Sequence, residues 1–158
     1  MFHKFNAKEI FEMAEQIERN GYQFYRKAAN ATKDETIKKF LLGLADMEVA
    51  HEKTFIGMKD QLTAKEKEEV VFDPYEETAA YIQALVDTRV FYEREIDMSS
   101  VEEVLKEAIS AEKESIVFYI GMKDMVPQDQ GKQKIDDIIR EEMGHIQIIN
   151  RHLMNLKK

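Results

Sequence analysis

The chain has 158 residues, of which 44% are hydrophobic and 34% are charged, so its size predicts one domain with a substantial core. Its formal net charge of −8 argues against nucleic acid or an anionic membrane as the main partner, because both attract an excess of Lys and Arg. The absence of cysteine excludes disulfides, thiolate metal sites and Cys-x-x-Cys electron-transfer modules.

The sequence pattern predicts an all-α protein. Only two prolines and six glycines interrupt it, and apolar residues recur at helical spacing almost throughout. No stretch approaches the ~20 apolar residues of a membrane span, so we expect a cytoplasmic protein.

The first two predicted helices carry ionisable residues on their apolar faces. Asn6 opens an Asn-x-x-Glu capping box at the start of the first helix, which carries Glu18 on its apolar stripe. The turn over residues 30–34 offers caps for the second helix, where Glu48 and His51 share one face with core residues. An unpartnered buried carboxylate costs several kcal/mol, so these positions require a partner such as a metal ion.

A crossover over about residues 61–98 is predicted to join two helix pairs. Asp73 as N-cap and Pro74 at the first helical position predict a helix from about Tyr75 to Glu95. Its apolar residues, which we expect to pack on the bundle or on a second subunit, are Tyr81, Ile82, Leu85, Val86 and Phe91.

The last two predicted helices repeat the arrangement of the first two. Ser99 and Ser100 open two overlapping Ser-x-x-Glu capping boxes before the third helix, and Pro127 separates it from the fourth. The two halves match at an offset of 94 residues without a gap. The matched pairs are Ala14 and Ala108, Glu18 and Glu112, Phe24 and Phe118, Tyr25 and Tyr119, Glu48 and Glu142, and His51 and His145.

This repeat predicts two similar helix pairs that face each other across a pseudo-twofold axis. A Glu and a His three residues apart lie on one face of a helix, which suits one metal ion. We therefore expect a single domain over residues 1–158, with helix pairs at about 6–60 and 99–156. If the four faces meet, six ligands converge: Glu18, Glu48, His51, Glu112, Glu142 and His145.

A Glu from each of two helices, with a Glu-x-x-His from each of the other two, matches ferritin-like di-iron and di-manganese bundles. The chain thus resembles the ferritin-like superfamily, and within it the rubrerythrin branch. The resemblance implies a four-helix bundle with a long crossover and a site for two iron ions, although manganese or zinc could compete. Four carboxylates would balance the charge of two Fe(II) ions.

The resemblance also implies roles for the six residues. Glu48 and Glu142 would bridge the two ions, Glu18 and Glu112 would be terminal carboxylates, and His51 and His145 would each cap one ion. Such proteins react with hydrogen peroxide or dioxygen, and here the electrons would come from an external donor protein. We expect a homo-oligomer, with a dimer favoured over a large shell.

Two features depart from full-length rubrerythrins. The chain lacks their cysteine-rich electron-transfer domain. Ser115 also stands where they carry an extra Glu, three residues after the third-helix ligand.

Three alternatives compete with a peroxide- or dioxygen-reducing enzyme. The first is a ferroxidase that stores or delivers iron. The second is a helical interaction module whose metal ions only stabilise the fold. In the third, the two Glu-x-x-His motifs are exposed contacts on charged helices without a metal.

Residues near the predicted ligands have less specific roles. Tyr25 and Tyr119 could hydrogen-bond a ligand carboxylate, supply an electron or simply pack in the core. Glu52 and Glu141 are expected to face away into solvent, and His3 and His152 to lie on the surface. The methionines expected to fill the core are Met13, Met47, Met58, Met122, Met125 and Met143.

Overall fold

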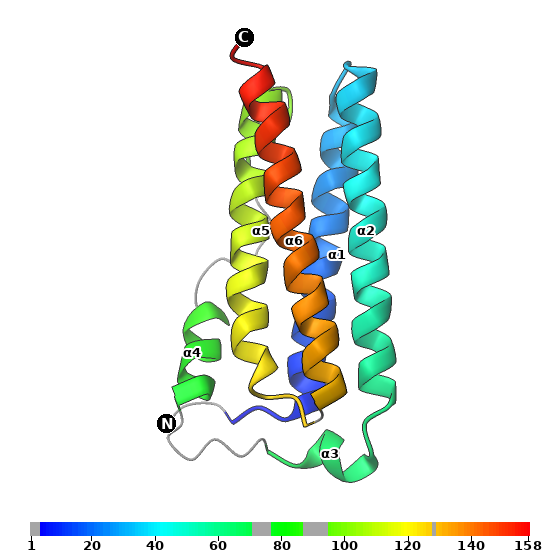
Figure 1. The fold of residues 1–158 in the computed structure, drawn as a ribbon, viewed down its shortest axis with the longest axis vertical. Coiled ribbons are helices and arrows are strands. Elements are labelled where there is room, and N and C mark those ends of the chain that lie inside the picture. The colour runs from blue at the N-terminus through cyan, green and yellow to red at the C-terminus, as the bar shows by residue number, and fades with distance from the viewer. Residues whose placement is uncertain (1–3, 71–76, 87–94, 128) are drawn as a thin grey trace.

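The computed structural model of the chain describes residues 4–70, 77–86, 95–127 and 129–158 and confirms the predicted all-α fold (Figure 1). Six helices make up this part of the chain, and its one β-type feature is an isolated antiparallel bridge between Asn6 and Val70. The helices are α1 (Ala7–Ala31), α2 (Glu35–Asp60), α3 (Ala64–Glu68), α4 (Glu77–Val86), α5 (Val101–Lys123) and α6 (Asp129–Asn155).

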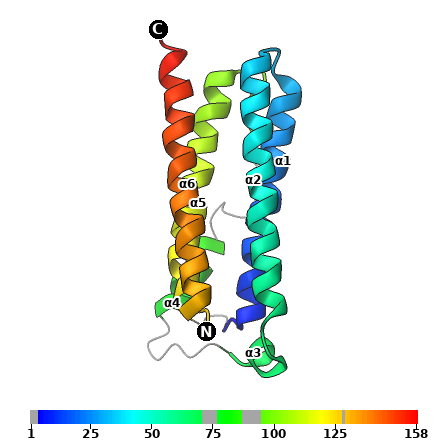
Figure 2. The same cartoon turned by 45° about the vertical axis from the view of Figure 1, so that its right-hand side comes forward.

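The four long helices form a bundle of two antiparallel pairs. Helix α1 packs along α2, and α5 packs along α6, and the two pairs stand side by side (Figures 1 and 2). The short helix α3 lies at one end of the bundle, where it contacts α1. No helix in the described part of the chain is both long and apolar enough to cross a membrane.

The predicted caps begin the long helices. Asn6 forms the full capping box with Glu9 at the start of α1, and Asp34 accepts hydrogen bonds from two backbone N–H groups of α2. Of the two serines before α5, Ser100 is the N-cap. Ser99 instead donates to the Asp97 carboxylate, with its backbone N–H at 2.9 Å and its Oγ at 2.6 Å.

Part of the predicted extra helix is present in the described residues of the crossover. Helix α4 covers residues 77–86, and Glu95 is not helical; Asp73, Pro74 and Phe91 lie outside the described residues. The Tyr81 hydroxyl donates to the Val117 carbonyl oxygen of α5 at 2.6 Å. The other apolar residues that pack α4 against the bundle are Ile82, Leu85 and Val86.

The core consists of two apolar clusters separated by ionisable side chains. One cluster surrounds Phe55 and Phe118, and the other surrounds Leu41 and Leu105. On each long helix, the buried residues of the Glu and His layer, Glu18, Glu48, His51, Glu112, Glu142 and His145, fall between the positions that contribute to these clusters. The polar layer is therefore closed by packed apolar side chains on both sides along the bundle axis.

Candidate metal centre

All six predicted ligands meet in the middle of the bundle. Helix α1 contributes Glu18, α5 contributes Glu112, and α2 and α6 each contribute a Glu-x-x-His pair. None of the six residues is more than 4% exposed. They form two overlapping groups whose possible ligand atoms lie within 4.8 Å of one another: Glu18, Glu48, His51 and Glu142, and Glu48, Glu112, Glu142 and His145.

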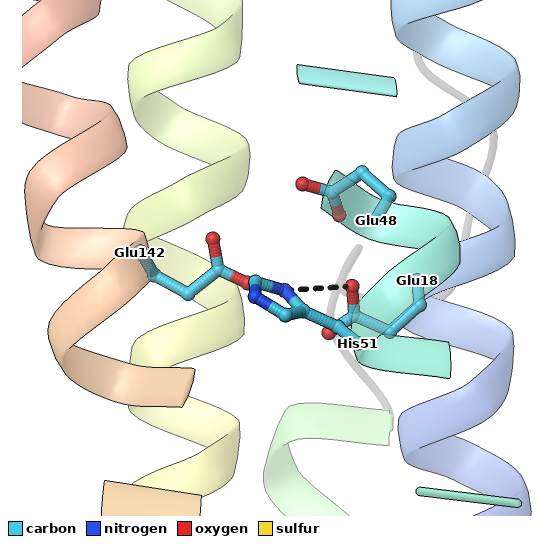
Figure 3. Close-up of side chains that lie close together, drawn as sticks. All are labelled: Glu18, Glu48, His51 and Glu142. Atoms are coloured by element: carbon cyan, nitrogen blue, oxygen red, sulfur yellow. Dashed lines mark ion pairs between the residues drawn. The ribbon is translucent and has the colours of Figure 1, made fainter. Parts of the chain in front are cut away.

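Glu142 lies between the two imidazole rings. His51 Nδ1 is 3.2 Å from Glu142 Oε1, and His145 Nδ1 is 2.8 Å from Glu142 Oε2. The rings stack with their centroids 5.9 Å apart. Figure 3 shows His51 reaching from α2 between Glu18 of α1 and Glu142 of α6. Since Glu48 and Glu142 belong to both groups, they occupy the shared positions that the resemblance implied for bridging ligands.

The inward-facing oxygen and nitrogen atoms of this six-residue cluster are better placed to bind metal ions than to hydrogen-bond one another. Among the described residues, six of these buried atoms make no hydrogen bond of good geometry, although the histidine nitrogens lie close to Glu142: Glu18 Oε2, Glu48 Oε1, His51 Nδ1, Glu142 Oε1 and Oε2, and His145 Nδ1. Buried polar groups normally have partners, so a concentration of unpaired acceptors requires an explanation. Carboxylate oxygen and imidazole nitrogen are a suitable donor set for iron or manganese, and the geometry provides for two ions.

Two tyrosines tie the helix pairs together at this centre. Tyr25 of α1 donates its hydroxyl to Glu112 Oε1 of α5, and Tyr119 of α5 donates to Glu18 Oε1 of α1. Burial, reinforced by the nearby carboxylates, raises the pKa of both phenols well above the usual value. Each tyrosine thus stays a donor and orients a carboxylate, which confirms the hydrogen-bonding alternative for this pair.

Without metal, the carboxylates repel one another in a buried site. Burial raises the pKa of Glu48 well above its usual value, and the charges of Glu18 and Glu142 raise it further. Burial also raises the pKa of Glu18, and it raises that of Glu112 to about 8. Burial alone would raise the pKa of Glu142 as well, but the two imidazoles that face it lower it.

The histidines show the complementary effect. Burial alone would lower the pKa of each ring, but the surrounding carboxylates raise it to about 11 for His51 and about 9 for His145. The metal-free cluster therefore retains protons in the space where cations would otherwise balance the charge.

Two predictions about neighbouring glutamates were incomplete. Glu141 was expected to face solvent, and its side chain is 52% exposed, yet its Oε2 lies 2.8 Å from His51 Nε2. The side chain is long enough to reach around from a neighbouring position on the helix. Glu52 is only 21% exposed, and its carboxylate lies 2.7 Å from the Arg19 guanidinium, so it is ion-paired on the bundle surface.

The predicted core methionines include buried and exposed side chains. Met58, Met122 and Met125 are buried as predicted, but Met47 is 37% exposed and Met143 is 47% exposed, so those two do not fill the core. Met47 Sδ lies 3.2 Å from His145 Nε2. His152 is half-buried and stacks on Phe40, away from the cluster, and His3 lies outside the described residues.

Small residues one turn after the α1 and α5 glutamates complete the site. A Cβ atom added at Gly21 would lie 2.5 Å from Glu48 Oε2, so the missing side chain makes room for that carboxylate. Ser115, at the equivalent place on α5, donates its hydroxyl to the Ala111 carbonyl oxygen at 3.1 Å. Gly21 and Ser115 match at the 94-residue offset of the repeat, and this match is the signal that the sequence offers for Gly21.

A four-helix bundle with carboxylates from all four helices, two of them in Glu-x-x-His pairs, defines the ferritin-like carboxylate proteins. A sequence model of the rubrerythrin family matches residues 9–153. The chain belongs to the rubrerythrin family.

The fold is also similar to a solved structure. This is the crystal structure of a Thermotoga maritima protein described as a ferritin-like diiron-carboxylate protein. It aligns with a TM-score of 0.71 and 26% sequence identity, over 98% of each chain. No curated protein sequence matches the chain.

Proposed function

We propose that the six-residue cluster holds two iron ions and that the protein reduces hydrogen peroxide or dioxygen with electrons held there. The observation that carries this proposal is the convergence of unpaired, buried oxygen and nitrogen atoms from four helices. Four carboxylates would neutralise two Fe(II) ions, so loading would relieve the charge repulsion that the metal-free cluster contains.

The side chains have distinct tasks in this proposal. Glu18 and His51 would hold one ion, Glu112 and His145 the other, and Glu48 and Glu142 would lie between them. When bound, ferrous ions can supply one electron each and act as Lewis acids. One peroxide molecule takes two electrons and two protons to give two water molecules. The apolar clusters on both sides would limit the access of bulk water to the reacting centre.

Oxidation of iron for storage or delivery is the second candidate, and Ser115 favours it. The Ser115 hydroxyl is bonded to its own helix, so position 115 provides no further carboxylate. A peroxidase mechanism that requires the additional glutamate of full-length rubrerythrins could not operate here. Oxidation of the bound Fe(II) ions themselves needs only the six-residue cluster.

The partners of the reaction are part of the proposal. The chain has no cysteine, so no thiolate-bound redox centre accompanies the cluster, and re-reduction would need an external electron donor protein. We also propose a small homo-oligomer, a dimer in the simplest case, that acts in the cytoplasm.

Anaerobic titration of metal-free protein with Fe(II), followed by mixing with peroxide or dioxygen, tests the proposal. Wild-type protein should bind two ions per chain and oxidise them rapidly. Glu48→Ala and His145→Ala should lose tight binding of at least one ion and with it this oxidation. Glu52→Ala is the matched control, because Glu52 lies one residue after His51 but is paired with Arg19.

The outcomes separate the candidate functions. Repeated oxidation and reduction of the same two ions supports the enzyme, whereas uptake of many ions per chain supports storage. Metal binding that raises the melting temperature without any oxidation would support a metal-stabilised interaction module. If Glu48→Ala and His145→Ala oxidised iron and consumed peroxide at the wild-type rate, the proposed site would be wrong.

A further inference from the structure

Both histidines of the cluster face buried carboxylates on their inner side, but their outer partners differ in kind. Each presents Nδ1 to the carboxylates and Nε2 to the outside of the cluster. His51 Nε2 lies 2.8 Å from Glu141 Oε2, whereas His145 Nε2 lies 3.2 Å from Met47 Sδ. A carboxylate therefore faces one ring where a thioether faces the other.

These two partners occupy equivalent places in the repeat. Met47 and Glu141 are separated by the same 94-residue offset as the ligands, and each directly precedes the Glu of a Glu-x-x-His motif. Each side chain reaches across to the histidine of the opposite helix pair. The scaffold is thus symmetric at this position, and the difference lies in the chemistry of one side chain.

That difference affects how well each ring can hold a cation. When Nδ1 binds a metal ion, Nε2 carries the ring proton and needs an acceptor. A carboxylate accepts this proton in a charge-assisted hydrogen bond, which fixes the tautomer and makes Nδ1 a stronger donor. A thioether is only a weak acceptor.

We propose that the two metal positions are unequal, and that Glu141 makes the position of His51 the tighter one, filled first. The inference rests on the proposed dinuclear site and specifies how that site loads. Loss of the outer partner of a metal-bound histidine typically lowers metal affinity about 10–100-fold. The first ion should therefore bind at least about tenfold more tightly than the second.

Anaerobic titration of metal-free protein with Co(II), followed by the visible absorption of the bound ion and by competition with a chelator, measures both steps. Glu141→Met gives His51 the same partner as His145, so the first step should weaken about 10–100-fold and the two affinities should converge. Met47→Glu makes the reciprocal change and should strengthen the second step. Glu52→Met removes a carboxylate that is paired with Arg19 outside the cluster, and it should change neither binding step.

Single-histidine backgrounds assign the effect to one ring. In His145→Ala protein, Glu141→Met should still weaken the remaining tight site. In His51→Ala protein, Glu141→Met should have no further effect, because its partner is gone. An equal effect in both backgrounds would show a general disturbance of the helix and would overturn the inference.

The titration also separates the inference from the proposed function. If wild-type protein bound no Co(II), the dinuclear site itself would be wrong. Two ions bound with the affinity ratio of identical sites, or with affinities that Glu141→Met left unchanged, would overturn only the inequality of the two positions.

Discussion

Among the described residues, Tyr25 and Tyr119 are the only two whose hydroxyl groups donate hydrogen bonds to carboxylates of the six-residue cluster. Each phenol is fully enclosed and donates to a glutamate of the opposite helix pair. The pair therefore links the two halves of the bundle at the level of the site.

Replacement of Tyr25 by Phe should leave Glu112 Oε1 without its donor in a buried site. We expect a loss of about 1–3 kcal/mol in the free energy of unfolding of metal-free protein. Metal affinity should fall about tenfold or more, because the carboxylate is no longer oriented. Tyr119→Phe should act similarly through Glu18, and Tyr22→Phe on the same helix as Tyr25 is the control. Calorimetric unfolding and Fe(II) titration measure the two effects, and wild-type affinity in both variants would contradict this role.

Gly21 offers a test of the space around Glu48. Ala is favoured over Gly in a helix by about 1 kcal/mol, yet the added Cβ would lie 2.5 Å from Glu48 Oε2. Gly21→Ala should therefore displace that carboxylate and weaken metal binding without lowering the melting temperature of metal-free protein. At Gly43, a Cβ would meet no described atom within 4 Å, so Gly43→Ala should raise stability and leave metal binding intact. Unchanged Fe(II) affinity in Gly21→Ala would show that Glu48 adapts freely.

At the scale of helices, α4 is attached to α5 through a close approach at Gly121. A Cβ added there would overlap the Tyr81 ring, with Cδ1 only 2.6 Å away, and would also crowd Ile82. The Tyr81 hydroxyl bond to the Val117 carbonyl oxygen depends on the same approach. The Tyr81 ring, which fits over Gly121, thus holds α4 to α5 together with the apolar contacts of Ile82, Leu85 and Val86.

Gly121→Ala should loosen α4 while the centre stays intact. The amides of residues 77–86 should exchange hydrogen faster than in wild-type protein, because the ring can no longer pack against α5. Metal binding should remain at two ions per chain, since Gly121 lies about two and a half turns beyond Glu112 on α5. Hydrogen exchange followed by mass spectrometry measures the first effect, with Gly57→Ala as the control. Equal exchange in both variants would show that α4 is held by other contacts.

For the whole molecule, the repeat made the bundle and its polar centre predictable from sequence. Glu48, His51 and their counterparts stood out because ionisable residues on an apolar stripe require partners, and the same spacing occurred twice. The caps at Asn6 and Asp34 were predictable because they depend on residues close in sequence.

Contacts between the helix pairs were harder to predict. Helical periodicity placed Glu141 about 100° away from Glu142, but it contains no information on the distance to the opposite pair. The length of the side chain and the separation of the helices decide whether Glu141 Oε2 reaches His51. The same holds for Met47 and His145, and for the close fit of Gly21 against Glu48.

The charge of the cluster determines how the stability of the metal-free protein depends on pH. The pKa values of His51 and His145 are raised from 6.5 to about 11 and about 9, so their stabilising contribution is complete below pH 6.5 and is lost as pH rises through those values. The pKa of Glu112 is raised from 4.5 to about 8, so the folded state holds a proton there that the unfolded state has released, and stability again falls with rising pH. The lowered pKa of Glu142 acts only in acid, where its contribution is lost as pH falls below 4.5.

Metal-free protein should therefore melt at its highest temperature near pH 5–6 and at progressively lower temperatures from pH 6 to pH 9. Protein loaded with two divalent ions should lose most of this dependence, because the ions replace the protons and bind more tightly as protons leave. Melting curves in chelator and with two equivalents of Co(II), recorded at pH 6, 7.5 and 9, measure the difference. Glu52→Gln removes a carboxylate outside the cluster and should leave the pH profile unchanged. If the melting temperature of metal-free protein stayed level or rose from pH 6 to pH 9, the cluster would not hold the extra protons inferred here. The raised pKa values require the melting temperature to fall over this range.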